Sequence, residues 1–205
     1  NPLRIHIKKT PTGIMVLIFN NIWRCLFMNK NKKAIINIAI TAVFASLIAL
    51  MTSQIKMPTG INDGYLHFGD CMIYLAACTL PLPYALIAAS VGGATADILA
   101  GAAVWAIPTA IIKALNALPF ALIYRLNLTK SPEKILNKQT SFMPLISGII
   151  TVLCYFIAEG FMYSFPAALL SVPLSCIQAL GSAILWYIAA AALDKMNFKR
   201  RINNG

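Results

Sequence analysis

The chain has 205 residues, of which 59% are hydrophobic and only 11% charged, and its mean hydropathy is +0.74. A soluble domain carries roughly 25% charged residues, so this chain has too little charge to cover a globular surface in water. Its length predicts one all-α bundle of about six membrane-spanning helices, since each span needs about 20 apolar residues. The basic residues behind the net charge of +11 lie between apolar runs, which indicates membrane topology rather than nucleic-acid binding.

Residues 1–28 differ from the rest of the sequence, because basic residues interrupt their short apolar stretch, 14–19. That stretch is too short to span a membrane, and no small-residue cleavage pattern of a signal peptide follows Met28. The stretch that begins at Met28 resembles a natural protein start. We therefore expect 1–28 to be an upstream extension or surface arm without a functional role, and 29–205 to form one membrane domain.

Six apolar segments follow and predict six transmembrane helices. In chain order they cover residues 34–51, 69–80, 83–100, 104–124, 142–162 and 168–193. The connection 52–66 is rich in Pro, Gly, Asn and Asp, which is typical of a loop. A second, charged loop is expected over 125–141.

The basic residues gather before the first helix, between the fourth and fifth, and after the sixth. They are Lys30, Lys32 and Lys33, then Arg125, Lys130, Lys134 and Lys138, then Lys195, Lys199, Arg200 and Arg201. With six spans these three regions share one side of the membrane, and the opposite loops carry Lys56 alone. The positive-inside rule then places both termini in the cytoplasm and the loop 52–66 outside.

Polar and aromatic residues lie within the predicted spans or directly beside them, mostly toward the outer ends of the spans. Ionisable groups inside a bilayer are costly and usually functional, so the pattern predicts an outward-facing pocket for a small solute. The polar candidates are His67, Asp97, Lys113, Asn116, Glu159 and Gln178, and the aromatic candidates are Tyr65, Trp105, Tyr155 and Tyr163.

The charged residues of this group also have structural interpretations. Asp70, at the start of the second helix, could cap that helix. Asp97 could form an ion pair with Lys113, whose long stem can reach about one turn along the helix. Glu159 could be solvated near the membrane surface.

The uncharged polar residues have structural interpretations as well. Asn116 and Gln178 could hold helices together through hydrogen bonds. His67, placed in a loop, could be a surface residue. The group as a whole therefore indicates a pocket more strongly than any of its members.

Small residues form two repeats at a spacing of four. On the third helix the repeat of Ala88, Gly92 and Ala96 predicts close helix packing. The first helix carries a similar stripe of small residues: Ala42, Ala45, Ser46 and Ala49. This stripe could dock another membrane protein or pack within its own bundle, and the sequence leaves both possibilities open.

Motifs for catalysis, ATP hydrolysis and metal binding are missing from the sequence. It has no GxSxG, HExxH or Walker motif, and its five cysteines form no CxxC pair. We therefore expect no metal, no cofactor and no enzymatic activity. Two alternatives stay open: an intramembrane enzyme that uses Asp97 and Glu159 as acid and base, and a membrane assembly subunit that transports nothing.

Several runs of residues in the sequence form a specific pattern. Between 67 and 115 they are Gly69 and Asp70, Gly92 to Gly101, and Pro108 to Leu115, and a later run covers residues 158–178. These runs resemble the substrate-binding S components of energy-coupling factor (ECF) transporters, although Ser175 stands where the family has Asn. The segment 67–115 is most similar to the branch assigned to hydroxymethylpyrimidine or pyridoxine uptake.

This resemblance implies a multi-pass plasma-membrane protein that holds a vitamin or heterocyclic precursor near the outer face, under a lid formed by the loop after the first helix. It also implies that the small-residue stripe meets a transmembrane coupling subunit joined to two cytoplasmic ATPases. In the family, the loaded S component topples within the membrane, and ATP hydrolysis on the partners drives release.

Overall fold

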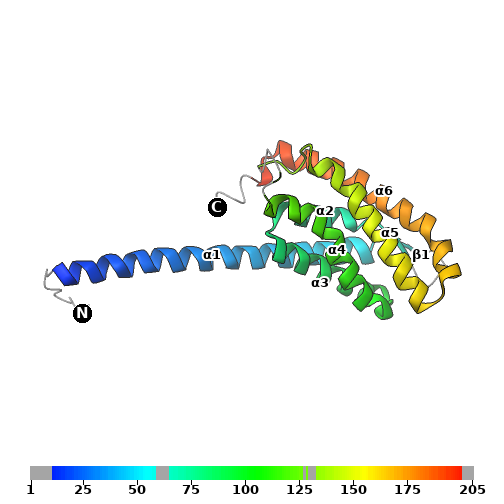
Figure 1. Cartoon of the computed structure of the whole chain (residues 1–205), viewed down its shortest axis with the longest axis horizontal. Coiled ribbons are helices and arrows are strands. Elements are labelled where there is room, and N and C mark those ends of the chain that lie inside the picture. The colour runs from blue at the N-terminus through cyan, green and yellow to red at the C-terminus, as the bar shows by residue number, and fades with distance from the viewer. Residues whose placement is uncertain (1–10, 59–64, 127, 129–132, 200–205) are drawn as a thin grey trace. The chain divides into compact units, whose positions relative to one another are not determined.

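The computed structural model describes residues 11–58, 65–126, 128 and 133–199, which are mainly helical (Figure 1). The elements are α1 (Pro11–Ser53), β1 (Lys56–Pro58), β2 (Tyr65–His67), α2 (Asp70–Thr79), α3 (Leu82–Ala100), the 3₁₀ helix η1 (Ala103–Trp105), α4 (Ala106–Arg125), the 3₁₀ helix η2 (Thr140–Phe142), α5 (Met143–Met162) and α6 (Phe165–Lys195). Within the described ranges, five stretches are long and apolar enough to cross a membrane, and α2 is a shorter apolar helix. This agrees with the expected all-α membrane protein.

The chain divides into two compact units, residues 1–38 and 39–205. The second unit contains the last part of α1 and every other element. The sequence predicted the first helix over 34–51, but α1 begins at Pro11. Proline suits the first position of a helix, and no glycine or proline interrupts the sequence from residue 14 to residue 53.

A small antiparallel sheet occupies part of the segment 52–66, which was predicted as loop only. In it Lys56 pairs with His67, and Pro58 pairs with Tyr65. Strands of three residues are too short to show a clear alternation of apolar and polar side chains, so the pattern did not predict them. The sheet brings Tyr65 and His67 to the start of α2.

The predicted bounds of the next four helices are confirmed to within two residues at each end. The last helix, α6, begins at Phe165 rather than at residue 168. The side chain of Ser164 caps it by accepting a hydrogen bond from the backbone N–H of Ala167, and Pro166 fits a first turn, where its missing N–H costs nothing. Pro173 lies inside the helix.

The described part of the charged loop between α4 and α5 is fastened to the end of α6. The carboxylate of Asp194 accepts hydrogen bonds from the backbone N–H groups of Ile135 (2.7 Å) and Leu136 (2.8 Å). Ile135 is completely buried. A carboxylate thus supplies partners for backbone groups that no regular element satisfies.

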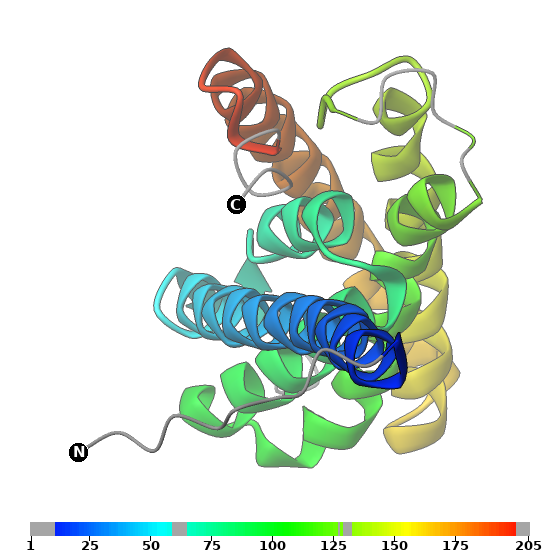
Figure 2. The same cartoon turned by 90° about the vertical axis from the view of Figure 1, so that its left-hand side faces the viewer.

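The short helix α2 lies among the longer helices α3, α4 and α6, as both views show (Figures 1 and 2). Most of its side chains are buried, including Asp70 in its first turn. Below Asp70, the ring of Tyr74 stacks on Phe120 of α4, and Phe120 meets Trp186 of α6 edge to face. The apolar helix α2 therefore delivers one carboxylate into the interior of the bundle.

Two neighbouring glycines on α3 allow close contacts, as the small-residue repeat predicted. A Cβ atom on Gly92 would lie 2.7 Å from the backbone oxygen of Ala45 on α1. A Cβ atom on Gly93 would lie 2.8 Å from Cγ of Lys113 on α4. Gly93 therefore leaves room for the stem of the lysine.

The small-residue stripe of α1 divides between two faces of that helix. Ala49 is buried, and Ala45 lies against α3 at Gly92. Ala42 and Ser46 are exposed, and the Ser46 hydroxyl donates to the backbone oxygen of Ala42. Half of the stripe thus serves the bundle, and the other half remains available to a partner.

Candidate functional site

A buried ion pair joins α2 and α4. The Nζ atom of Lys113 lies 2.5 Å from Oδ1 of Asp70, and the two side chains are 1% and 0% exposed. The suggested pairing of Lys113 with Asp97 is therefore wrong. The first turn of α2 faces α4, which brings Asp70 within reach of Lys113. Asp70 does not cap α2 as one interpretation suggested, because Gly69 is the N-cap residue and no side chain bonds to the helix there.

Asn116 extends this ion pair to a third helix. Its Nδ2 atom donates to Oδ2 of Asp70 (3.2 Å) and to the hydroxyl of Thr151 on α5 (2.6 Å). The Ser147 hydroxyl, also on α5, donates to the backbone oxygen of Asn116 (2.8 Å). Asn116 thus joins helices, as its structural interpretation proposed, and both oxygens of Asp70 have partners.

The second carboxylate, Asp97, is bound from the β-sheet. The Tyr65 hydroxyl donates to its Oδ1 atom over 2.5 Å. Burial, followed by this hydrogen bond, raises the pKa of Tyr65, so the phenol stays protonated as a donor. The other oxygen of Asp97, Oδ2, is buried and has no hydrogen-bond partner among the described residues.

An aromatic group lies beside these polar residues. The ring of Trp105 is 5.9 Å from that of Tyr155 and 6.1 Å from that of Tyr163, measured between centroids. Tyr155 shares a hydrogen bond with Thr109, and the Lys113 ammonium lies 5.3 Å from the centre of its ring. Trp105 is buried, and its Nε1 atom has no hydrogen-bond partner in the part of the chain that the structure describes.

A turn and one helix face position this group. Gly101 ends α3 in the left-handed conformation (φ 84°), which favours glycine, and the chain then enters η1. Trp105, Thr109 and Lys113 follow at intervals of four residues, so they lie on one face where α4 begins. From the start of α4 toward its middle, this face therefore presents an aromatic ring, a hydroxyl group and an ammonium group in that order.

His67 is buried, not a surface residue as its structural interpretation supposed. Its Nδ1 atom accepts a hydrogen bond from the backbone N–H of Gly69 (3.1 Å), and its own backbone N–H donates to Oε1 of Gln178 (3.3 Å). Burial, helped by the charge of Lys113, lowers the pKa of His67 to about 3. The imidazole is therefore neutral, with its proton on Nε2.

Glu159 is also buried rather than solvated. Its Oε2 atom accepts a hydrogen bond from the hydroxyl of Ser171, which also donates to the backbone oxygen of Ala168 (2.9 Å). This contact joins α5 to α6 close to the turn between them. In the structure one of its partners is therefore Ser171 of α6, and the predicted contact of Glu159 with a solute stays a prediction.

A family model described as ECF-type riboflavin transporter, S component, matches residues 32–195. The chain belongs to this family. No match was found among curated proteins or among solved structures.

Membership defines the S component as a membrane substrate-binding subunit for vitamin uptake, in a transporter family rather than an enzyme family. The expected resemblance to ECF S components is thus confirmed, as is the multi-pass membrane location. The family model does not specify the hydroxymethylpyrimidine or pyridoxine branch. The described residues contain no group of three or more His, Cys, Asp and Glu side chains that could hold a metal ion.

The S component assembles most of the predicted solute contacts into two adjoining groups. One group contains Trp105, Lys113, Asn116, Tyr155 and Tyr163, and the other contains Tyr65, His67, Asp97 and Gln178. The two groups are close enough for the charge of Lys113 to lower the pKa of His67. The predicted set of solute contacts did not include Asp70. The sequence contained a signal for it, since a carboxylate at the start of an apolar helix indicates a functional residue.

Proposed function

We propose that the S component binds one planar heterocyclic vitamin or vitamin precursor between its aromatic and polar groups. The observation that carries the proposal is the pair of buried atoms Asp97 Oδ2 and Trp105 Nε1, which have no partner among the described residues. A buried polar atom without a partner costs about 1–3 kcal/mol. A ligand that donates to Asp97 and accepts from Trp105 removes that cost.

The surrounding side chains suit a flat, polar ring. Tyr155 and Tyr163 provide aromatic faces beside Trp105, and ring stacking adds to the energy of burial. In this proposal Lys113, Asn116, Gln178 and the Nε2–H of His67 are the further polar contacts. Glu159 holds α5 to α6 next to Tyr163.

We infer that the β-sheet acts as the lid of this site. Two of its hydrogen bonds reach different helices: the Tyr65 hydroxyl donates to Asp97 on α3, and the backbone N–H of His67 donates to Gln178 on α6. Both must break for the sheet to lift. Closure would exclude water and strengthen the polar contacts to the solute.

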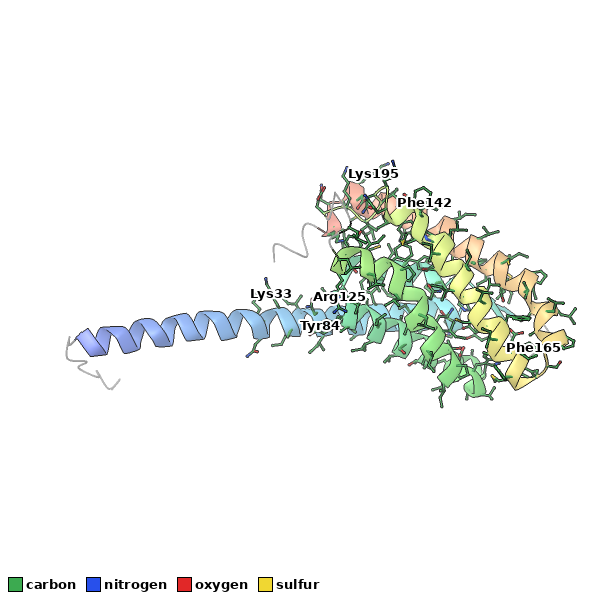
Figure 3. The ribbon with its side chains drawn as sticks, viewed as in Figure 1. Lys33, Tyr84, Arg125, Phe142, Phe165 and Lys195 are labelled. Carbon is green, nitrogen blue, oxygen red and sulfur yellow. The ribbon has the colours of Figure 1, made fainter. Side chains whose placement is uncertain are left out.

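The membrane topology is part of the same proposal: six crossings, both termini in the cytoplasm, and the site at the outer face. In this topology α2 crosses the membrane in addition to the five long apolar stretches. Its short length is tolerated because most of its side chains are enclosed by protein. Arg125 and Lys195 lie toward one end of the bundle and Phe165 toward the other (Figure 3). Basic residues at the first end favour the cytoplasm.

We further propose that the exposed face of α1 docks the transmembrane coupling subunit, which is joined to two ATPases. Ala42 and Ser46 lie on this face, next to the exposed side chains of Val43 and Leu47. Small side chains permit close helix contacts within a membrane. Ala45 borders the face, and the buried Ala49 supports it from within.

The identity of the vitamin can be tested directly. Riboflavin appears in the description of the matching family, whereas the segment 67–115 resembles the branch for hydroxymethylpyrimidine or pyridoxine. Native mass spectrometry of the full purified chain identifies the molecule that co-purifies. Calorimetric titration with riboflavin, pyridoxine and hydroxymethylpyrimidine then ranks their Kd values, and tight binding of one of them is expected.

A pair of tryptophan variants tests the site. Trp105→Phe keeps an aromatic ring but removes the indole N–H, and we expect it to weaken binding about tenfold. Trp186→Phe is the matched control, because Trp186 is also completely buried but packs against Phe120 in the apolar core, away from the proposed site. Equal Kd values for Trp105→Phe and wild type, or no binding of any vitamin, would contradict the proposal.

A further inference from the structure

We propose that Asp70 sets the charge selectivity of the solute site: by neutralising Lys113 it makes the S component accept vitamins without a phosphate group and reject their phosphate esters. This inference rests on the proposed solute site.

Asp70 is fully engaged by the protein. Its Oδ1 atom binds the Lys113 ammonium at 2.5 Å, and its Oδ2 atom accepts from Nδ2 of Asn116 at 3.2 Å. Asp97 differs, because one of its oxygens has no partner among the described residues. Asp70 therefore acts through Lys113 as a positioning residue, whereas Asp97 can meet the solute itself.

Lys113 is the cation of this site that would attract the phosphate group of a ligand. Its ammonium lies 5.3 Å from the centre of the Tyr155 ring, and Tyr155 contacts Trp105. An unpaired lysine here would attract an anion strongly, because a buried charge is little screened by water or salt. The contact with Asp70 cancels that attraction.

The summed charge of the site points the same way. Lys113 and Asp70 cancel each other in charge and His67 is neutral, so the site offers no uncompensated positive charge, and the carboxyl group of Asp97 adds negative charge when it is ionised. A phosphate ester adds a charge of about −1.5 to −2. Like charges in close contact disfavour binding, whereas an uncharged vitamin meets no such repulsion.

Close packing holds Asp70 in this position. A Cβ atom on the preceding residue, Gly69, would lie 1.9 Å from the hydroxyl oxygen of Thr52. The start of α2 is thus pressed against the end of α1. The N-terminus of a helix also favours a carboxylate in its first turn, so the position of Asp70 in α2 stabilises its negative charge.

The test compares matched ligand pairs on the full chain: riboflavin with riboflavin 5′-phosphate, and pyridoxine with pyridoxine 5′-phosphate. We expect the wild type to prefer the unphosphorylated member of the pair that binds. In Asp70→Asn the ratio of the two Kd values should shift toward the phosphate ester about tenfold or more, because Lys113 becomes free to bind phosphate. Asp70→Glu, which retains the charge, should keep the wild-type preference.

A double variant covers the case in which Asp70→Asn fails to fold with an unpaired buried lysine. Asp70→Asn/Lys113→Met removes both charges, so we expect it to discriminate against the phosphate ester as the wild type does. A double variant that binds both members equally would overturn the inference, as would an unchanged ratio in folded Asp70→Asn. Vitamin binding with an unchanged ratio defeats this inference alone, whereas no vitamin binding by the wild type defeats the proposed function with it.

Discussion

The buried carboxylates of the S component differ in what their oxygens contact. Both oxygens of Asp70 bind groups of α4, one oxygen of Glu159 binds Ser171, and Asp97 keeps an oxygen without a partner among the described residues. Chemically similar side chains therefore serve different purposes. Among the three buried carboxylates of the described residues, Asp97 is the one that combines an acceptor oxygen without a partner with a hydrogen bond from Tyr65 of β2.

His67 makes the stability of the S component depend on pH. The pKa of His67 is about 3 in the folded chain, against an ordinary value of 6.5. Between these values the unfolded chain binds a proton that the folded chain does not, so the folded state loses stability as the pH falls below 6.5. The loss reaches about 1.4 kcal/mol per pH unit.

Thermal unfolding of the purified protein between pH 7 and pH 5 measures this effect. His67→Gln should unfold with a flatter pH dependence, whatever its stability at pH 7. His6→Gln is the control, since His6 is the other histidine of the sequence, and it should behave as the wild type. An identical pH slope in His67→Gln and wild type would exclude the buried neutral histidine.

At the scale of elements, contact between α1 and α3 depends on a glycine. Gly92→Ala would bring a Cβ atom to 2.7 Å from the backbone oxygen of Ala45, which cannot move aside as a flexible side chain can. We expect this variant to lower the free energy of unfolding by about 1–3 kcal/mol. Val91→Ala, at an exposed neighbouring position, should change it by about 0.5 kcal/mol or less, and equal losses in the two variants would contradict close packing at Gly92.

The exposed face of α1 makes a second prediction at this scale. Ala42→Leu adds bulk where the coupling subunit is proposed to dock, so it should reduce co-purification with that subunit and leave the Kd for the vitamin unchanged. Ala192→Leu makes the same change at an exposed position of α6 and should assemble normally. Assembly of Ala42→Leu at the wild-type level would rule out docking through this residue.

At the scale of the whole molecule, every residue of the proposed solute site lies in the second unit, residues 39–205. The family match begins at residue 32, so residues 1–28 lie outside both the second unit and the family match. The first ten of them also lie outside the described part of the chain. Deletion of 1–28 should therefore leave membrane insertion and vitamin binding intact. Fractionation of membranes and the Kd of the shortened chain measure this.

A longer deletion provides the contrast. Removal of residues 1–50 takes away Phe44 and Ile48, which belong to the hydrophobic core, and should prevent folding. If the deletion of 1–28 were equally damaging, those residues would have a role in the membrane domain. The predicted boundary at residue 28 would then need to move toward the N-terminus.

The sequence by itself determined the class of molecule and the places of its helices. Hydrophobicity and length are properties of each segment alone, so the bounds of α2, α3, α4 and α5 could be predicted closely. The set of polar and aromatic candidates also came from the sequence, because an ionisable group is conspicuous in an apolar run. The short strands β1 and β2 were missed, since three residues carry little periodic signal.

Only the tertiary structure decided which of these residues meet. Lys113 binds Asp70 rather than Asp97, His67 is buried by the β-sheet and α6, and Ala49 faces its own bundle. The physical reason is that a contact between helices depends on their rotation and relative depth, which the pattern of a single segment does not contain. In the S component those two variables decide which carboxylate neutralises the buried lysine and which has an oxygen to offer a solute.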